Sequence, residues 1–217
     1  MAQLTLYNYY RSSTSYRVRI ALNLKDLAYE YRAVHLLNNG GEQNLPEYRN
    51  LNPVGGLPTL VDGDKAISQS FAIIEYLDDA FPQTYQLLPK DAYKKAKVRQ
   101  VCENINADIH PYQNLKLMNY LEKNYHFTPD QKTEWVQKWI HEGLSATEKI
   151  VATTFKNYAF GDQITAADLF IVPQLFSSER FKVDISAYPT LFQISQNCLK
   201  LEAFKKAHPM QQIDAGN

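Results

Sequence analysis

A cluster of hydroxyl side chains lies near the N-terminus, between a strand-like pattern and a helical one. The segment Arg11–Arg17 reads Arg-Ser-Ser-Thr-Ser-Tyr-Arg. Because the first N–H groups of a helix have no partner within it, hydroxyls and N–H groups at such a place converge and favour an anion. The same hydroxyls could instead serve only to cap the helix.

Two further segments could complete a site for a peptide-like acid. Pro58 stands at the mouth of a predicted strand, where proline suits an edge or a cis turn. With a cis bond there, Leu57 can offer its backbone to a peptide ligand. Gln69 and Ser70 begin a predicted helix that runs to Ala80, and free N–H groups at its start would bind a carboxylate.

Short strand and helix patterns alternate through the first eighty residues and would position these segments. Strand patterns lie at 4–7, 29–34, 59–61 and 66–68, and helical patterns at 15–25 and 70–80. The turn Asp62-Gly63-Asp64 predicts that the last two strands are antiparallel, whereas the first two need the helix between them as a crossover. The predicted order is βαβ followed by ββα.

Strand patterns stop after Pro82 and Pro89, and the remainder has helical periodicity with breaks near 127–129 and 157–162. We therefore predict two domains, residues 1–83 and 90–217, of which the second is all helical. Within it, Thr165-Ala166-Ala167-Asp168 has the form of a capping box, and Ile164 is placed to staple onto the helix. We interpret this segment as a structural helix start.

The bulk composition excludes several classes of partner. Lys plus Arg and Asp plus Glu each total 23 in 217 residues, so no overall field attracts nucleic acid or an anionic membrane. Cys102 and Cys198 lack metal-ligand spacing and are expected to be thiols in a reducing compartment. The N-terminus has no leader pattern, and no apolar run reaches the roughly 18 residues of a membrane span. We therefore expect a cytoplasmic protein without a metal.

The three segments together resemble the N-terminal half of a glutathione transferase, a thioredoxin-like fold that binds the tripeptide along its edge. The run from Ser12 to Leu22, Ser-Ser-Thr-Ser-Tyr-Arg-Val-Arg-Ile-Ala-Leu, is similar to the SSCxxRVRIAL signature of the zeta class, which includes maleylacetoacetate and maleylpyruvate isomerases. The resemblance continues through 51–53, 61–63, 69–70, 72–77, Asn114, 172–174 and 179–184. It departs at Thr14, where the family usually has cysteine, and this leaves side activities of that thiol open.

The resemblance implies an α/β thioredoxin-like domain followed by an all-α domain, with glutathione as a recycled cofactor. The implied reaction is isomerisation of maleylacetoacetate to fumarylacetoacetate in tyrosine and phenylalanine catabolism. The implied catalytic residues are Ser12, Ser13, Arg11 and Arg180. The implied glutathione contacts are Ser12, Ser13, Thr14, Ser15, Tyr16, Arg17, Gln43, Leu57, Gln69, Ser70, His110, Asn114, Leu115 and Lys116.

Several alternatives stay open at this stage. The substrate could be maleylpyruvate, or the scaffold could carry out conjugation, dehalogenation of small haloacids or peroxide reduction. A non-catalytic binding module of the same fold is a further reading. Arg180 could pair with Glu179 or Asp184 instead of a substrate carboxylate, and His110 could be structural. The resemblance also implies a homodimer, and we expect no nucleic-acid or membrane partner.

Overall fold

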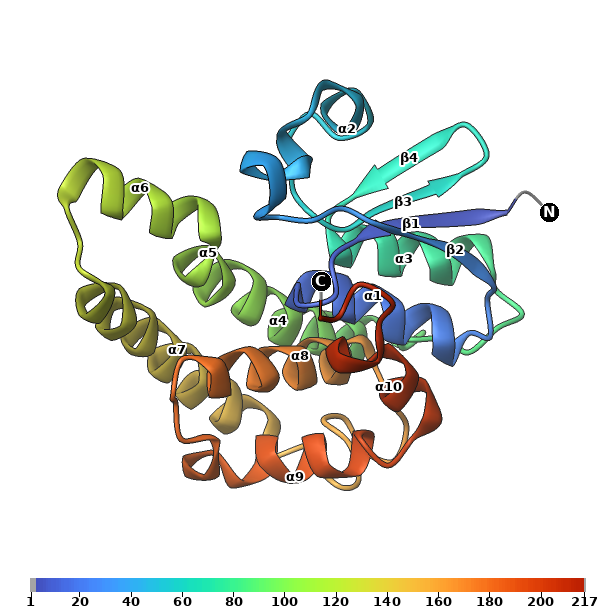
Figure 1. Ribbon diagram of the computed structural model, residues 1–217. Helices are drawn as coiled ribbons and strands as arrows, with labels where there is room; N and C mark the ends of the chain where they lie inside the picture. Colours follow the sequence, from blue (N-terminus) through green and yellow to red (C-terminus); the bar gives the residue numbers. More distant parts are fainter. Residues whose placement is uncertain (1–2, 217) are drawn as a thin grey trace. The chain divides into compact units, whose positions relative to one another are not determined.

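The computed structural model describes residues 3–216. They form two compact units: residues up to Leu88 together with those from Leu199 onward, and Pro89–Cys198. The first unit contains β1 (Leu4–Asn8), α1 (Ser13–Leu24), β2 (Tyr29–Ala33), η1 (Asn38–Gly40), η2 (Glu42–Asn44), α2 (Pro46–Leu51), β3 (Thr59–Asp62), β4 (Lys65–Ser68), α3 (Ser70–Ala80), α10 (Glu202–Ala207) and η4 (Pro209–Gln211) (Figure 1). The second contains α4 (Ala92–Asp108), α5 (His110–Gln113), α6 (Leu115–Tyr125), α7 (Pro129–Val151), α8 (Ala166–Arg180), η3 (Ile185–Ala187) and α9 (Pro189–Cys198).

The sheet of the first unit has four strands in the order β2-β1-β3-β4. β1 runs parallel to β2, with Leu4 opposite Tyr29, and antiparallel to β3, with Leu4 opposite Asp62. β3 and β4 are antiparallel, and Gly63 between them has a φ of 62°. Parallel neighbours cannot be joined by a tight turn, so α1 crosses over between β1 and β2. The predicted order of βαβ and then ββα is confirmed.

The core of the first unit lies between the sheet and helices α1 and α3, which cover the same face (Figure 1). β1 alternates buried and half-buried residues, as expected for a strand with one face in the core. Leu6 and Leu60 from the sheet and Ile20 and Ile74 from the helices are fully buried.

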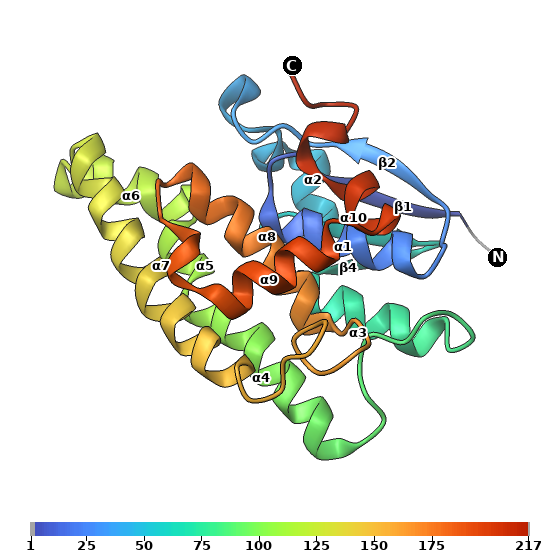
Figure 2. The same ribbon diagram turned by 90° about the horizontal axis from the view of Figure 1, so that it is seen from below.

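Helix α10 packs against α1 within this same unit (Figure 2). The carbonyl of Ala207 accepts a hydrogen bond from Nε of Arg19 at 3.0 Å, and the carbonyl of Ala203 accepts one from Nδ2 of Asn23 at 3.0 Å. Helical periodicity grouped these residues with the helices that follow Pro89, whereas their contacts are with α1. Periodicity identifies a helix but does not say which core the helix joins.

A buried ion pair fixes the segment that follows α3, up to Leu88. Nζ of Lys25 lies 2.7 Å from Oδ1 of Asp78, and both side chains are almost wholly buried. Asp78 also accepts from the N–H groups of Leu87 and Leu88, and Lys25 donates to the carbonyl of Tyr85. The segment after α3 is thereby fixed to both α1 and α3.

The helical unit places its core between α4, α7, α8 and α9. Ile105, Leu144, Phe170 and Leu191, one from each of these helices, are fully buried. The unit therefore has a hydrophobic core of its own, as expected of a domain.

The predicted break at 127–129 separates α6 from α7. His126 ends α6 in the left-handed conformation with a φ of 56°. Thr128 caps α7 and forms a capping box with Gln131, and Pro129 is the first helical residue. These are the usual stop and start signals of helices, and they explain why the break could be predicted.

The predicted capping box at the start of α8 is also confirmed. Oδ2 of Asp168 accepts from the N–H of Thr165 at 2.8 Å and from its hydroxyl at 3.1 Å. Oδ1 accepts from the N–H of Ala159 at 2.8 Å, which fixes the preceding loop. Burial of this carboxylate raises the pKa of Asp168 to about 6.

Both cysteines, Cys102 and Cys198, are buried thiols that form no disulfide within residues 3–216. Burial raises the pKa of the Cys198 thiol, so this group is not a nucleophile at neutral pH. Within residues 3–216, no group of three or more His, Cys, Asp and Glu side chains could hold a metal ion. No helix in that range is long and apolar enough to cross a membrane.

Candidate active site

The hydroxyl residues 12–15, which we call the hydroxyl loop, form the N-terminus of α1. This helix begins at Ser13, two residues before the predicted start. Ser12 is the N-cap: its Oγ accepts from the N–H of Ser15 at 3.2 Å, and its carbonyl accepts from the N–H of Tyr16 at 2.9 Å. The capping interpretation of this hydroxyl is therefore correct. A capping hydroxyl acts as an acceptor, however, so its hydrogen is left for another partner.

That hydrogen of Ser12 goes to Thr14. The two hydroxyl oxygens lie 2.9 Å apart, and Oγ1 of Thr14 donates to the carbonyl of Leu57 at 2.9 Å. A threonine hydroxyl has only one hydrogen, so Ser12 must be the donor in its pair with Thr14. A directed chain of hydrogen bonds thus connects the N-terminus of α1 to the segment that leads into β3.

The segment before β3 contains the predicted cis bond, between Leu57 and Pro58. The carbonyl of Gly56 accepts from the hydroxyl of Tyr48 at 2.6 Å and from Nδ2 of Asn52 at 2.9 Å. Tyr48 belongs to α2, a six-residue helix that the periodicity analysis missed. A proline at its first position, Pro46, is the signal that could have revealed it.

The N-terminus of α3 brings together three of the predicted residues. Gln69 immediately precedes the helix with a φ of 74°, a conformation that costs a non-glycine residue roughly 1–3 kcal/mol and is found mostly at functional sites. Oγ of Ser70 accepts from Nη1 of Arg17 at 3.1 Å. Arg17 is fully buried and comes from α1, so a positive charge lies beside the helix end that favours anions.

The other predicted residues of the first unit differ in how a ligand could reach them. The side chains of Ser15 and Tyr16 are fully buried, so they can contact a ligand only through their backbone. Ser13 is 7% exposed. Gln43 is half-buried in η2, and Arg11 is exposed beside the hydroxyl loop.

Two residues that the sequence analysis did not select support the hydroxyl loop. The carbonyl of Tyr9 accepts from the N–H of Ser12 at 3.0 Å. The hydroxyl of Tyr9 lies 3.4 Å from Nε2 of His35. Nδ1 of His35 accepts from the N–H groups of Leu37 and Asn38, so Nε2 carries the hydrogen that points to Tyr9. Burial raises the pKa of Tyr9, which keeps its phenol neutral at physiological pH.

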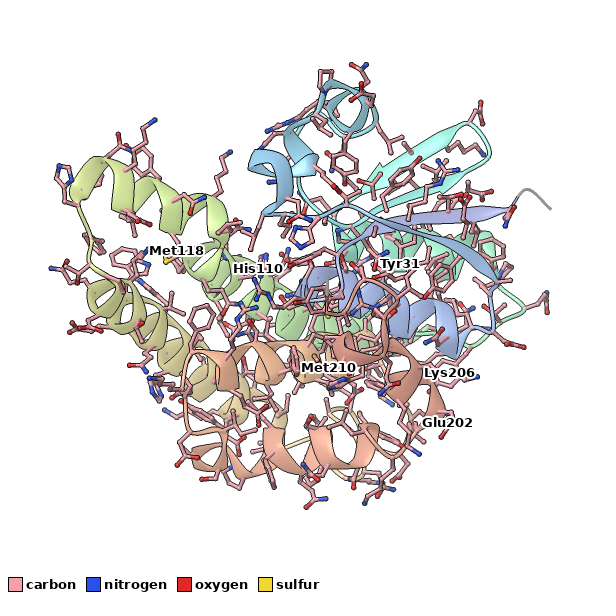
Figure 3. The ribbon with its side chains drawn as sticks, viewed as in Figure 1. Tyr31, His110, Met118, Glu202, Lys206 and Met210 are labelled. Carbon is pink, nitrogen blue, oxygen red and sulfur yellow. The ribbon has the colours of Figure 1, made fainter. Side chains whose placement is uncertain are left out.

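Four predicted residues lie together at the junction of α5 and α6 in the helical unit. His110 is the first residue of α5 and is labelled in Figure 3. Asn114 caps α6, and its Oδ1 accepts from the N–H of Lys116 at 2.9 Å. Leu115 is half-buried and Lys116 is exposed. The side-chain oxygen of Asn114 therefore has a structural partner already.

Arg180, the last residue of α8, belongs to the same helical unit. Its guanidinium lies 5.0 Å from the centre of the Phe181 ring, a cation–π arrangement. The carboxylate of Asp184, one of the alternative partners from the sequence, accepts from the N–H and hydroxyl of Ser186.

A pair of buried amides joins α5 to α8. Nε2 of Gln113 donates to Oε1 of Gln174 at 3.0 Å, and Nε2 of Gln174 donates to Oε1 of Gln113 at 3.3 Å. The helix that carries His110 is thus fixed to the helix that carries Arg180. Reciprocal amide bonds of this kind link residues far apart in the chain and leave no local pattern in a sequence.

Comparison with known proteins identifies the family of this chain. The family described as glutathione S-transferase, N-terminal domain, matches residues 6–85. The probable maleylacetoacetate isomerase of Vibrio cholerae is 43% identical over 215 residues, which cover 99% of this chain and 100% of that protein.

Two solved structures are similar over nearly the whole chain. The holo structure of a bacterial maleyl pyruvate isomerase of the zeta class has a TM-score of 0.93 and 40% identity, and the match covers 98% of this chain and 100% of that one. The maleylacetoacetate isomerase of Methylobacterium extorquens, solved with bound malonate and GSH, has a TM-score of 0.91 and 32% identity with the same coverage. The chain therefore belongs to the zeta class of glutathione transferases, the family of the maleylacetoacetate isomerases.

Proposed function

We propose that this protein is a glutathione-dependent cis-trans isomerase that converts maleylacetoacetate to fumarylacetoacetate. The observation that carries the proposal is the hydroxyl of Ser12, which caps α1 but gives its hydrogen to Thr14. That hydrogen can turn toward a ligand sulfur without breaking the cap. Membership of the zeta class, and the GSH bound to the Methylobacterium relative, support glutathione as the cosubstrate.

The reaction requires the thiolate form of glutathione. A thiol with a pKa of about 8.5 is only a few per cent ionised at neutral pH. Lowering that pKa by about 2 units takes about 2.7 kcal/mol. One charge-assisted hydrogen bond from Ser12, worth about 1.5–3 kcal/mol, together with the helix N-terminus, worth about 0.3–1 kcal/mol, can supply it. No protein base is required.

The rest of the tripeptide would lie along the segments that the structure brings together. An α-carboxylate fits the N-terminus of α3, where Gln69, Ser70 and the buried charge of Arg17 meet. The backbone of Leu57 at the mouth of β3 suits the peptide portion, and Gln43 is assigned to the same ligand. The thiol and the α-carboxylate of glutathione would then each be held by a helix N-terminus.

In the proposed reaction the thiolate sulfur attacks one carbon of the cis double bond. The electron pair of that bond moves onto the conjugated carbonyl oxygen as an enolate, and the remaining single bond rotates. The enolate pair then re-forms the double bond in the trans geometry and expels the thiolate. Glutathione is returned unchanged, so the balance needs no oxidant or reductant. Catalysis requires a stabilised thiolate and positive charge near the enolate oxygen.

We assign binding of the diacid to two arginines. Arg11 is exposed beside the hydroxyl loop, and Arg180 is the last residue of α8 in the helical unit. Guanidinium groups bind carboxylates through two parallel hydrogen bonds and would also stabilise the enolate. His110 and Lys116 at the start of α5 and α6 would add hydrogen-bond donors, and the backbone at Leu115 completes this set.

Maleylpyruvate is the second candidate substrate. The holo maleyl pyruvate isomerase is similar with a TM-score of 0.93, and this resemblance is the observation that favours it. Both substrates have a cis double bond between two acid-bearing arms and would use the same thiolate chemistry. The ratio of the kcat/KM values for the two diacids decides between them.

We further propose that the protein is a cytoplasmic homodimer that acts in aromatic amino-acid catabolism. The two buried cysteines, which form no disulfide in the described part of the chain, support a reducing compartment. The zeta-class resemblance supports the dimer. Light scattering of the purified protein tests the second point: a monomer at micromolar concentration would contradict it.

The function is tested by following conversion of maleylacetoacetate to the trans product with and without glutathione. We expect turnover only with glutathione. Ser12→Ala should lower kcat/KM roughly 10- to 150-fold, since it removes a charge-assisted hydrogen bond to the thiolate worth about 1.5–3 kcal/mol. Thr128→Ala is the matched control: it removes the N-cap of α7 at a similar stability cost of about 1 kcal/mol, and should leave kcat/KM unchanged. Equal turnover without glutathione would contradict the proposal.

A further inference from the structure

The C-terminal segment carries a buried carboxylate that the proposed mechanism does not use. Asp214 is only 6% exposed although it lies three residues from the C-terminus. Its Oδ2 accepts from the N–H of Tyr10 at 3.0 Å, and its Oδ1 accepts from the hydroxyl of Tyr31 at 2.5 Å. Tyr31 is labelled in Figure 3 and belongs to β2.

A buried arginine holds the same loop from α1. Nη2 of Arg19 donates to the carbonyl of Tyr10 at 2.9 Å, and Nη1 donates to the carbonyl of Tyr9 at 3.3 Å. Nη1 also donates to Oδ1 of Asn8, and Nε donates to the carbonyl of Ala207 in α10. Arg19 is fully buried, so its guanidinium is committed to the backbone on either side of the loop.

Both backbone groups of Tyr10 are therefore fixed by charged side chains, its N–H by Asp214 and its carbonyl by Arg19. The carbonyl of the preceding Tyr9 receives the N–H of Ser12 as well as Arg19. Hydrogen bonds to charged groups are about twice as strong as neutral ones. The orientation of the peptide that leads into Arg11 and Ser12 is consequently set from outside the loop.

Arg19 and Asp214 have opposite charges and reach the backbone of Tyr10 from different parts of the chain. Burial lowers the pKa of Arg19, and the charge of Asp214 is among the effects that raise it. Burial, and the hydrogen bond to Asp214, raise the pKa of Tyr31, so this phenol stays a neutral donor across the working pH range.

We propose that Asp214 is a positioning residue of the glutathione site: through Tyr10 the C-terminal segment sets the geometry with which Ser12 meets the thiolate. The inference rests on the proposed function, because it concerns the Ser12 donor. The C-terminal segment thereby belongs to the support of the site, although no local sequence pattern links Asp214 to Tyr10. Nothing in it requires Asp214 to touch glutathione or the diacid.

The test compares Asp214→Ala with the wild type by titrating bound glutathione and following the ultraviolet absorbance of its thiolate. We expect the pKa of the bound thiol to rise by about one unit, which corresponds to roughly tenfold less thiolate at low pH. The pH profile of kcat should move by the same amount, with the KM for glutathione little changed, since Ser70 and Gln69 are not affected. Ile213→Ala, at a neighbouring side chain that is 76% exposed, should match the wild type.

Asp214→Asn is the conservative variant and should rescue the pKa. Its side-chain oxygen can still accept from the N–H of Tyr10, while its amide hydrogen bonds the rotated hydroxyl of Tyr31. If Asp214→Ala does not fold, Asp214→Ser takes its place, since serine is too short to reach both Tyr10 and Tyr31, and the same pKa rise is expected.

The possible failures are distinguishable. A fall in the melting temperature of Asp214→Ala with an unchanged thiol pKa and unchanged kcat would overturn the positioning role. Absence of thiolate absorbance or of turnover in the wild type itself would instead overturn the proposed function. A rise in thiol pKa in Asp214→Ala with rescue in Asp214→Asn supports the proposal.

Discussion

Replacement of Thr14 by valine is expected to lower both the pKa of the bound glutathione thiol and the stability of the fold. Thr14 accepts the hydrogen of Ser12 and donates its own to the carbonyl of Leu57. Valine has nearly the same shape and a similar helix propensity, but no hydroxyl. The hydrogen of Ser12 is then released from its resting partner and is available to the sulfur without competition.

The magnitudes follow from the two hydrogen bonds that are lost. A neutral hydrogen bond contributes about 0.5–1.5 kcal/mol net, so ending the competition for the Ser12 hydrogen should lower the pKa of the bound thiol by about 0.4–1 unit. The carbonyl of Leu57 loses a donor, and Thr14 is only 8% exposed. The free energy of unfolding should therefore fall by about 1–3 kcal/mol.

The assay is a pH titration of the thiolate absorbance of bound glutathione, combined with urea denaturation of the same samples. Thr14→Ser is the matched control, because it keeps a hydroxyl that can make both bonds and should leave the thiol pKa close to that of the wild type. A higher or unchanged thiol pKa in Thr14→Val would refute the reasoning, since Thr14 would then not be the resting acceptor of the Ser12 hydrogen.

Three further predictions concern other parts of the molecule. Arg180→Ala should reduce kcat/KM for the diacid roughly tenfold to hundredfold by removing a charge-assisted carboxylate contact, while glutathione affinity measured by calorimetry is retained; weakened glutathione binding would argue against the assignment. Lys25→Met should lower the free energy of unfolding by about 3–5 kcal/mol because it leaves Asp78 buried without its cation, and Lys25→Met with Asp78→Leu should recover most of that loss in urea denaturation. Burial raises the pKa of Asp168 to about 6, above the value of about 3.9 in an unfolded chain. The folded state therefore binds this proton more tightly, and stability falls by up to about 3 kcal/mol as the pH rises from 4 to 7. Asp168→Asn should remove this contribution, and an identical pH dependence in both proteins would contradict it.

The structural features that could be predicted from the sequence depend on residues that are close together in the chain. The bounds of α3 at Ser70 and Ala80, the turn at Gly63 and the capping box of Asp168 depend on neighbours within one helical turn or one hairpin. The candidate site was predictable to the same extent, because its hydroxyl loop and the segment at Pro58 are each local. How those segments meet was not predictable, since the bond from Thr14 to the carbonyl of Leu57 crosses 43 positions.

Buried charge is the main thing that sequence reasoning missed. Arginine is rarely fully buried, so nothing in the sequence marks Arg17 and Arg19 on α1 as core residues, yet neither is exposed. The bond of Tyr31 to Asp214 joins residues 183 positions apart. Such contacts depend on the tertiary arrangement of α1, β2 and the C-terminal segment, and no periodicity in the sequence encodes them.

The first unit is built from two stretches of chain that are synthesised at different times. During translation the sheet, α1 and α3 leave the ribosome first, whereas Ala207 and Asp214, which bind Arg19 and Tyr10, are made only after the helical unit. At about 5–20 residues per second, the intervening stretch takes on the order of 10 s to synthesise. Throughout that interval the nascent unit has a guanidinium that lacks part of its final set of acceptors. The contacts that hold residues 8–12 are therefore completed only after the segment with Ala207 and Asp214 has been synthesised, whereas the sheet, α1 and α3 can form earlier.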